Sequence, residues 1–101
     1  MALITKGGTR QIRTNLNESE LQSGSWHGIY TDAPDSFEMS DITLDGWQII
    51  RDHYNVAMYV LSTGRSPVHN AAIGGATASR HLFSIEDLNV EAMDWYFEDQ
   101  N

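Results

Sequence analysis

A long segment without periodicity separates two short apolar stretches of this chain. The segment Gly64–His81, GRSPVHNAAIGGATASRH, shows neither the period of an amphipathic helix nor the alternation of a strand, so it is predicted to be a loop. Before it, Val56–Leu61 (VAMYVL) is short, β-branched and aromatic, which predicts a buried strand. After it, Val90–Phe97 (VEAMDWYF) alternates well enough to predict a second strand. The fold must therefore join two strands across a long loop, and such loops in small domains are often functional.

A first helix is predicted directly after residue 16. In the sequence LNESEL, Asn17 can act as the N-cap and Glu20 is the third helical residue, which together form a capping box. Leu16 and Leu21 stand where a hydrophobic staple would close the helix entry. These four residues predict a helix start with a defined entry angle.

The segment SDITLDGWQIIRDHY, residues 40–54, is the clearest predicted helix of the chain. Ser40 or Asp41 can cap its N-terminus, and Asn55 is a plausible stop. The apolar face is predicted to carry Ile42, Ile49, Ile50, His53 and Tyr54.

These elements predict one α+β domain in which helices pack on a small, mainly antiparallel sheet that contains both strands. With 101 residues, 41% of them hydrophobic, the chain can build a single core. Residues 1–15 are polar, contain glycine and lack a period, so they are expected to form a flexible arm. Residues 16–101 would then form the domain.

Charge and cysteine content exclude several classes of function. The formal net charge is −8, with a single lysine, which argues against binding to nucleic acid or to anionic membranes. Without cysteine, a metal would have to be held by histidine and carboxylate side chains. No apolar run approaches the ~20 residues of a membrane span, and the N-terminus lacks the apolar stretch of a signal peptide. We therefore expect a protein that is made in a cytoplasm and is exported, if at all, by another route.

One carboxylate stands out in the second strand. Alternation places Asp94 on the face that also carries Val90, Ala92 and Tyr96, where an unpaired charge would be costly. A metal could pair it, and His81 could supply an imidazole. Hydrolytic zinc sites typically use three nitrogen and oxygen ligands and leave one position for water. The spacing also fits an Asp94 that accepts hydrogen bonds at a strand end and a partly exposed polar His81, and it does not separate these alternatives.

The loop sequence closely resembles the signature of the zinc D-alanyl-D-alanine carboxypeptidase-like peptidases. This family has the Hedgehog/DD-peptidase fold and includes many bacteriophage peptidoglycan hydrolases. The matching segments, in the family's order, are STGRSPVHN, AAIGGA, SRH and AMD. The upstream NLNESELQS and DGWQIIRDHY resemble that family's first helix and long helix, so the likeness runs from about Asn15 to Phe97.

The resemblance implies a role for four residues. His81 and Asp94 would be zinc ligands, and Arg65 would bind a substrate carboxylate or a developing oxyanion. Arginine suits that role because its planar guanidinium can pair with a carboxylate through two hydrogen bonds. Ser79 would help to shape the substrate site. The residues alone would equally fit an Arg65 engaged in a surface ion pair.

The remaining histidines have other expected roles. His69 matches a family position that is not a ligand, and with Arg65 and Asn70 it is expected to pin the loop, so that the loop is ordered. His53, near a helix end, is expected to be a residue at the core edge or a cation at the helix C-terminus. His27, in SWHG, is a weaker candidate for a substitute ligand.

The sequence departs from the family pattern in two ways. The family spacing from histidine to aspartate is short, whereas LFSIEDLNVE separates His81 from the matching AMD, and Ser84 stands in place of a glycine. Asp94 is the preferred ligand because its segment also matches the strand, and Asp87 is the alternative. The family's third ligand, a histidine, and its catalytic acid or base lie further along than Asn101.

The resemblance therefore implies a zinc-dependent peptidoglycan peptidase of the phage type, either a carboxypeptidase or an endopeptidase. It would be made in a bacterial cytoplasm and act on the stem peptides of the cell wall. The alternative is an inactive module with the same fold, for example a virion component that contacts other virion proteins. Without the third ligand, a zinc ion is expected to be weakly held by this chain.

Overall fold

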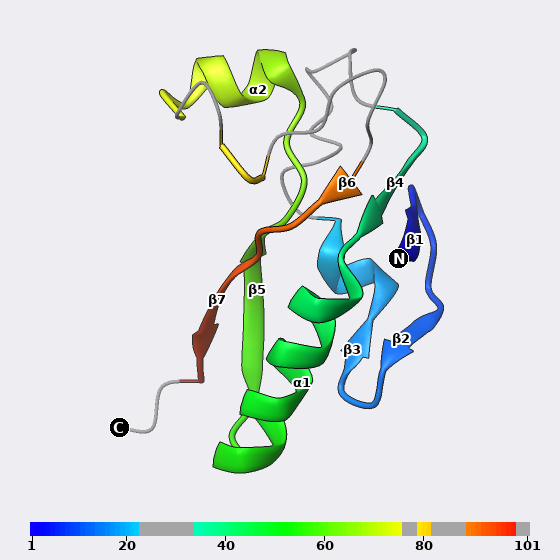
Figure 1. Cartoon of the computed structure of the whole chain (residues 1–101), viewed down its shortest axis with the longest axis vertical. Coiled ribbons are helices and arrows are strands. Elements are labelled where there is room, and N and C mark those ends of the chain that lie inside the picture. The colour runs from blue at the N-terminus through cyan, green and yellow to red at the C-terminus, as the bar shows by residue number, and fades with distance from the viewer. Residues whose placement is uncertain (23–33, 76–78, 82–88, 99–101) are drawn as a thin grey trace.

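The structure is a computed structural model that describes residues 1–22, 34–75, 79–81 and 89–98. Figure 1 shows the course of the chain and labels its α-helices and strands. In chain order they are β1 (Ala2–Thr5), β2 (Gln11–Arg13), β3 (Leu16–Asn17), the 3₁₀-helix η1 (Glu18–Leu21), β4 (Ser36–Met39), α1 (Asp41–Tyr54), β5 (Met58–Ser62), α2 (Pro67–Ala72), β6 (Asn89–Val90) and β7 (Asp94–Phe97). This mixture of helices and short strands is the predicted α+β class.

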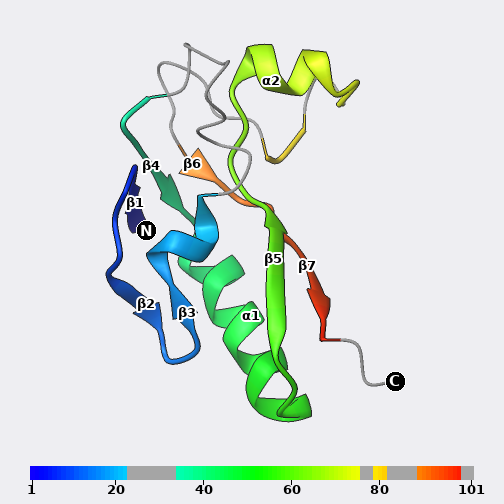
Figure 2. The ribbon, with the colours of Figure 1, turned by 180° about the vertical axis from the view of Figure 1, so that it is seen from behind.

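Within the described residues the strands form three small sheets. β4 lies between β1, which is antiparallel to it, and β6, which is parallel to it. β2 and β3 form an antiparallel pair, as do β5 and β7. The predicted strand Val90–Phe97 is thus divided, because Val90 pairs with Met39 of β4 whereas Asp94–Phe97 pairs with β5. Figure 2 shows β5 and β7 side by side from the opposite direction.

The expectation of a flexible arm over residues 1–15 is corrected by the structure. β1 pairs with β4 over its whole length, from Ala2 opposite Met39 to Thr5 opposite Ser36. Ile4 is fully buried in the core. The short alternation of ALIT, whose partner lies more than thirty residues away in β4, gives only a weak local signal in the sequence.

The predicted capping box is present, although the helix that it starts is a single turn. The Asn17 side chain accepts a hydrogen bond from the backbone N–H of Ser19, and the Glu20 side chain accepts one from the backbone N–H of Asn17. Leu16 and Leu21 are both fully buried. The capping prediction is confirmed, and η1 brings Leu21 into the core.

The long helix has the predicted bounds but a different buried face. α1 ends at Asn55, which adopts the left-handed conformation with a φ of 51°. Leu44 and Trp47 are its buried residues, whereas Ile42 and Ile49 are 86% and 68% exposed. More than one set of apolar residues in this segment fits a helical period. The set that is buried contains Leu44 and Trp47, which pack in the core cluster. Among the described residues no helix is both long and apolar enough to cross a membrane.

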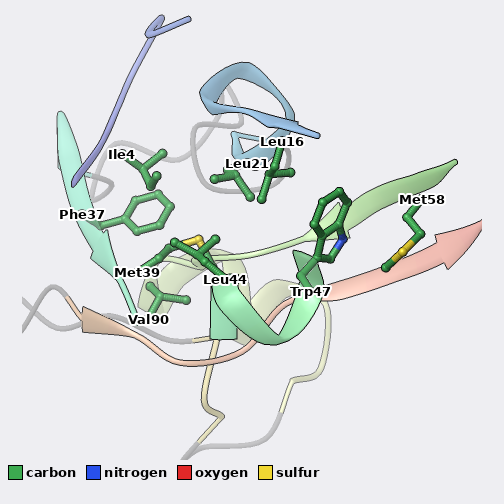
Figure 3. Packing of buried hydrophobic residues seen from close by; sticks show 9 residues of the cluster. All are labelled: Ile4, Leu16, Leu21, Phe37, Met39, Leu44, Trp47, Met58 and Val90. Atoms are coloured by element: carbon green, nitrogen blue, oxygen red, sulfur yellow. The ribbon is translucent and has the colours of Figure 1, made fainter. Parts of the chain in front are cut away.

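One core connects the sheets to α1. Its fully or nearly buried members, drawn in Figure 3, are Ile4, Leu16, Leu21, Phe37, Met39, Leu44, Trp47, Met58 and Val90. Val60 and Trp95 of the β5–β7 pair pack against this cluster, and the rings of Tyr54 and Phe97 meet edge to face at 5.3 Å. One face of the β5–β7 pair is therefore held against α1.

A buried carboxylate joins the N-terminal segment to η1. Glu18 is fully buried, and its oxygens accept hydrogen bonds from the backbone N–H groups of Thr5, at 2.7 Å, and Arg10, at 3.1 Å. The Arg10 guanidinium donates to the same carboxylate from Nε and Nη2. These contacts lower the pKa of the Glu18 carboxyl from 4.5 to about 2, with the hydrogen bond from the Arg10 side chain as the largest cause.

Candidate metal centre

The sheet register places Asp94 beside the end of β5. Ser62, the last residue of β5, is opposite Asp94, the first residue of β7, and its hydroxyl donates to Asp94 Oδ2 at 2.9 Å. Trp95 packs on the core, so Asp94 and Tyr96 lie on the opposite face of β7. The Asp94 side chain is 56% exposed. The expectation of a buried face around Asp94 is therefore wrong, because the core side of this strand is the one that carries Trp95.

His81 is brought to this carboxylate from the far end of the loop. Its ring Nε2 lies 3.2 Å from Asp94 Oδ2, and its side chain is only 11% exposed. The backbone N–H of Arg65 donates to the carbonyl oxygen of His81 at 2.7 Å, and the backbone N–H of His81 donates to Ser79 Oγ at 3.3 Å. The two ends of the loop are thus tied together at the strand end, and Ser79 contacts the backbone of His81.

The contact of the other ring nitrogen, Nδ1, determines which nitrogen of His81 can bind a metal ion. Nδ1 lies 2.7 Å from the carbonyl oxygen of Thr63, which can only accept, so Nδ1 carries a proton. With this tautomer, the lone pair of Nε2 faces the oxygen of Asp94, so that a cation placed between the two atoms would be bound by both. A histidine that donates one N–H to a backbone carbonyl and presents its other nitrogen is the usual form of a metal ligand. The donor set therefore fits a metal ion such as zinc.

Arg65 adds a positive charge at the edge of this pair. Its Nη2 is 3.8 Å from Asp94 Oδ2, and its Nη1 donates to the side-chain oxygen of Asn70 at 3.3 Å. The Arg65 side chain is 14% exposed. The structure thus gathers Arg65, His81 and Asp94 at one point.

The segment predicted to be a loop contains a short helix. α2 begins at Pro67, and the Ser66 side chain caps it by accepting from the backbone N–H of His69 at 3.1 Å. A serine N-cap followed by proline is a helix-start signal that periodicity does not detect over so short a span. The prediction of an uninterrupted loop is corrected here.

The part of the chain that the structure describes contains no group of three metal-ligating side chains. The alternative ligand Asp87 and the weaker candidate His27 lie outside the described residues. His53 is exposed near the end of α1, where its ring meets Tyr54 edge to face at 4.7 Å. Of the predicted ligands, His81 and Asp94 are the two that the structure brings together.

The sequence argument missed Ser62 and Thr63, which support the pair. Thr63 is fully buried, and its hydroxyl donates to the carbonyl oxygen of Leu21 at 2.6 Å while its own carbonyl meets His81. A Ser-Thr pair directly after an apolar strand is a signal for strand-end hydrogen bonding, but it does not identify the partner.

Comparison with known protein families gives a match that covers most of the chain. The family model described as Peptidase M15 matches residues 13–101, which includes every predicted site residue. The chain belongs to the peptidase M15 family. Peptidases of this family are zinc-dependent in general. No curated protein and no solved structure matches the chain significantly.

We expect Thr63→Val to weaken metal binding by about tenfold, in the range found for groups that support a ligand. The valine keeps the size of the side chain but leaves the Leu21 carbonyl without the hydroxyl, so the backbone that orients His81 loosens. Thr63→Ser keeps the hydroxyl and should bind zinc as the parent chain does. Zinc titration by calorimetry measures both variants, and equal affinities for Thr63→Val and the parent would contradict this role.

Proposed function

We propose that this M15 family member is a zinc-dependent peptidase that cleaves the peptide part of peptidoglycan, as a carboxypeptidase or an endopeptidase of bacteriophage origin. The observation that carries the proposal is the approach of His81 Nε2 to Asp94 Oδ2, with the other ring nitrogen already committed to a backbone carbonyl. The substrate class and the phage origin are supported by the likeness of the loop signature. On this proposal the chain acts at the cell wall, or as part of a virion, and contacts no nucleic acid or membrane.

In this proposal His81 and Asp94 hold the zinc ion from one side. Bound zinc supplies a water of lowered pKa and polarises a carbonyl group. Arg65 would bind a substrate carboxylate or stabilise a developing oxyanion, because its guanidinium stands beside the metal pair and is partly accessible. Ser79, two residues before His81, would help to shape the substrate site. The Asp94 side chain itself is 56% exposed.

The test is hydrolysis of purified peptidoglycan by the metal-free chain with and without added zinc. Once the third ligand and the catalytic acid or base that the family pattern implies are supplied by a longer chain or a neighbour, we expect zinc-dependent release of new amino groups that a chelator abolishes and that further zinc restores. A matched control is His53→Ala, which removes an exposed histidine near the end of α1 and should leave the activity unchanged. Failure to bind zinc and failure to release amino groups would together refute the proposal.

A second candidate is a binding or structural module that keeps the fold without the chemistry. It is favoured by the finding that the described residues supply two metal-ligating side chains at the site and no third. Zinc binding without any turnover would support this module over the peptidase. Such a module would be expected to assemble with other virion proteins.

A further inference from the structure

Asn70 is a buried amide in contact with the candidate site but not with the metal pair. It is 4% exposed, and its backbone is fixed on both sides within α2 and the turn that follows. Its backbone N–H donates to the carbonyl oxygen of Ser66 at 2.9 Å, and its own carbonyl oxygen accepts from the backbone N–H of Gly75 at 2.8 Å. The side-chain oxygen accepts from Arg65 Nη1 at 3.3 Å. The amide is therefore a fixed point to which the guanidinium is attached.

Gly75 leaves the space that this amide occupies. A Cβ atom on Gly75 would lie 2.8 Å from Asn70 Cγ, closer still to its side-chain oxygen, and 3.2 Å from Arg65 Nη1. The neighbouring Gly74 has a positive φ of 71°, whereas Gly75 does not adopt a positive φ. Close approach of a side chain, and not backbone conformation, therefore requires glycine at this position.

The geometry of Arg65 shows what this attachment does. An arginine free to pair with a carboxylate usually approaches to about 2.7–2.9 Å and uses both nitrogens of its fork. Here Nη2 remains 3.8 Å from Asp94 Oδ2, and Nη1 is directed to Asn70 instead. The same Oδ2 faces His81. An arginine in full contact with Asp94 would neutralise the charge that a metal ion needs there.

We propose that Asn70 is a positioning residue that holds the Arg65 guanidinium beside the Asp94 carboxylate without letting it close onto that carboxylate. This inference rests on the proposed metal site and deepens it. Asn70 keeps the Asp94 oxygen next to His81 available to a cation, and it keeps Nη2 of Arg65 at 3.8 Å from that oxygen. Gly75 contributes to this positioning because the absence of a Cβ atom leaves space for the Asn70 amide.

The direct test follows the Arg65 side chain by NMR in the metal-free chain, where no assumption about zinc enters. In the parent chain and in Asn70→Asp, which keeps an acceptor oxygen, we expect slow rotation of the guanidinium and separate signals for its two terminal nitrogens. In Asn70→Ala and in Gly75→Ala these signals should merge. Gly46→Ala is the matched control, because a Cβ there meets nothing within 4 Å. If Asn70→Ala does not fold, Gly75→Ala carries the test, and identical Arg65 signals in parent and variant overturn the proposal.

The consequence for the metal is tested by zinc titration in a double-mutant cycle. Asn70→Ala should lower zinc affinity by about tenfold in the parent background, as loss of a supporting group does. In the Arg65→Ala background, where no guanidinium can close onto Asp94, the same change should alter affinity by less than about twofold. Equal losses in both backgrounds would overturn the proposal. If no variant binds zinc, the proposed function fails, while the NMR comparison still decides whether Asn70 positions Arg65.

Discussion

Replacing Glu18 with glutamine is expected to lower the free energy of unfolding by about 2–3 kcal/mol, a large part of the stability of so small a domain. All four described donors to this carboxylate are N–H groups, from the backbones of Thr5 and Arg10 and from the Arg10 guanidinium. A glutamine side chain keeps the shape but places an NH₂ group against some of these donors. Urea unfolding at neutral pH measures the loss. Glu38→Gln, on the exposed side of β4, is the matched control and should change stability by less than about 0.5 kcal/mol.

The same carboxylate predicts how stability depends on pH. The pKa of Glu18 is lowered to about 2 in the folded chain from its ordinary 4.5, so between these values the unfolded chain binds more protons. Its stabilising contribution is complete above about pH 5 and is lost as the pH falls toward 2. The difference in stability between the parent and Glu18→Gln should therefore shrink as the pH falls from neutral to about 3. A difference that stays constant over this range would contradict the assignment.

Local signals predicted much of the framework. The capping box at Asn17 and the left-handed stop at Asn55 depend on neighbouring residues, and both are present in the structure. The pairing of the two predicted strands also follows from composition and alternation, apart from the break between Val90 and Asp94. Features of this kind are encoded within a few residues and so are accessible to sequence reasoning.

Features that depend on distant partners could not be predicted in this way. The strand around Ile4 exists because β4 pairs with it, and the buried face of α1 is set by the core cluster that Leu44 and Trp47 join. The same limit applies at the site. The loop signature brought His81 and Asp94 together as candidates, but the Thr63 carbonyl that orients the ring and the Asn70 amide beside Gly75 are visible only in three dimensions.

Removal of the imidazole of His81 is the strongest expected effect at the site. Mutation of a group that only supports a metal ligand typically lowers metal affinity by about 10–100-fold. Since His81 is the proposed ligand itself, His81→Ala should lower zinc affinity by at least about 100-fold and leave zinc binding near the detection limit. The ring is held at Nδ1 by Thr63, and its Nε2 is directed at Asp94. Zinc titration by calorimetry measures the loss. His53→Ala removes an exposed histidine from α1 and should leave zinc affinity as it is in the parent chain.

Two aspartate variants test which carboxylate binds zinc together with His81. Asp94→Asn keeps an oxygen that can accept from Ser62 but removes the charge beside His81 Nε2, so we expect a loss comparable to that of His81→Ala. Asp87→Asn should have little effect if Asp94 is the ligand. The opposite result, with zinc affinity lost in Asp87→Asn and kept in Asp94→Asn, would transfer the ligand role to Asp87. The contact between His81 and Asp94 would then be an ion pair with a protonated histidine, and the Ser62 hydrogen bond would serve only the strand end.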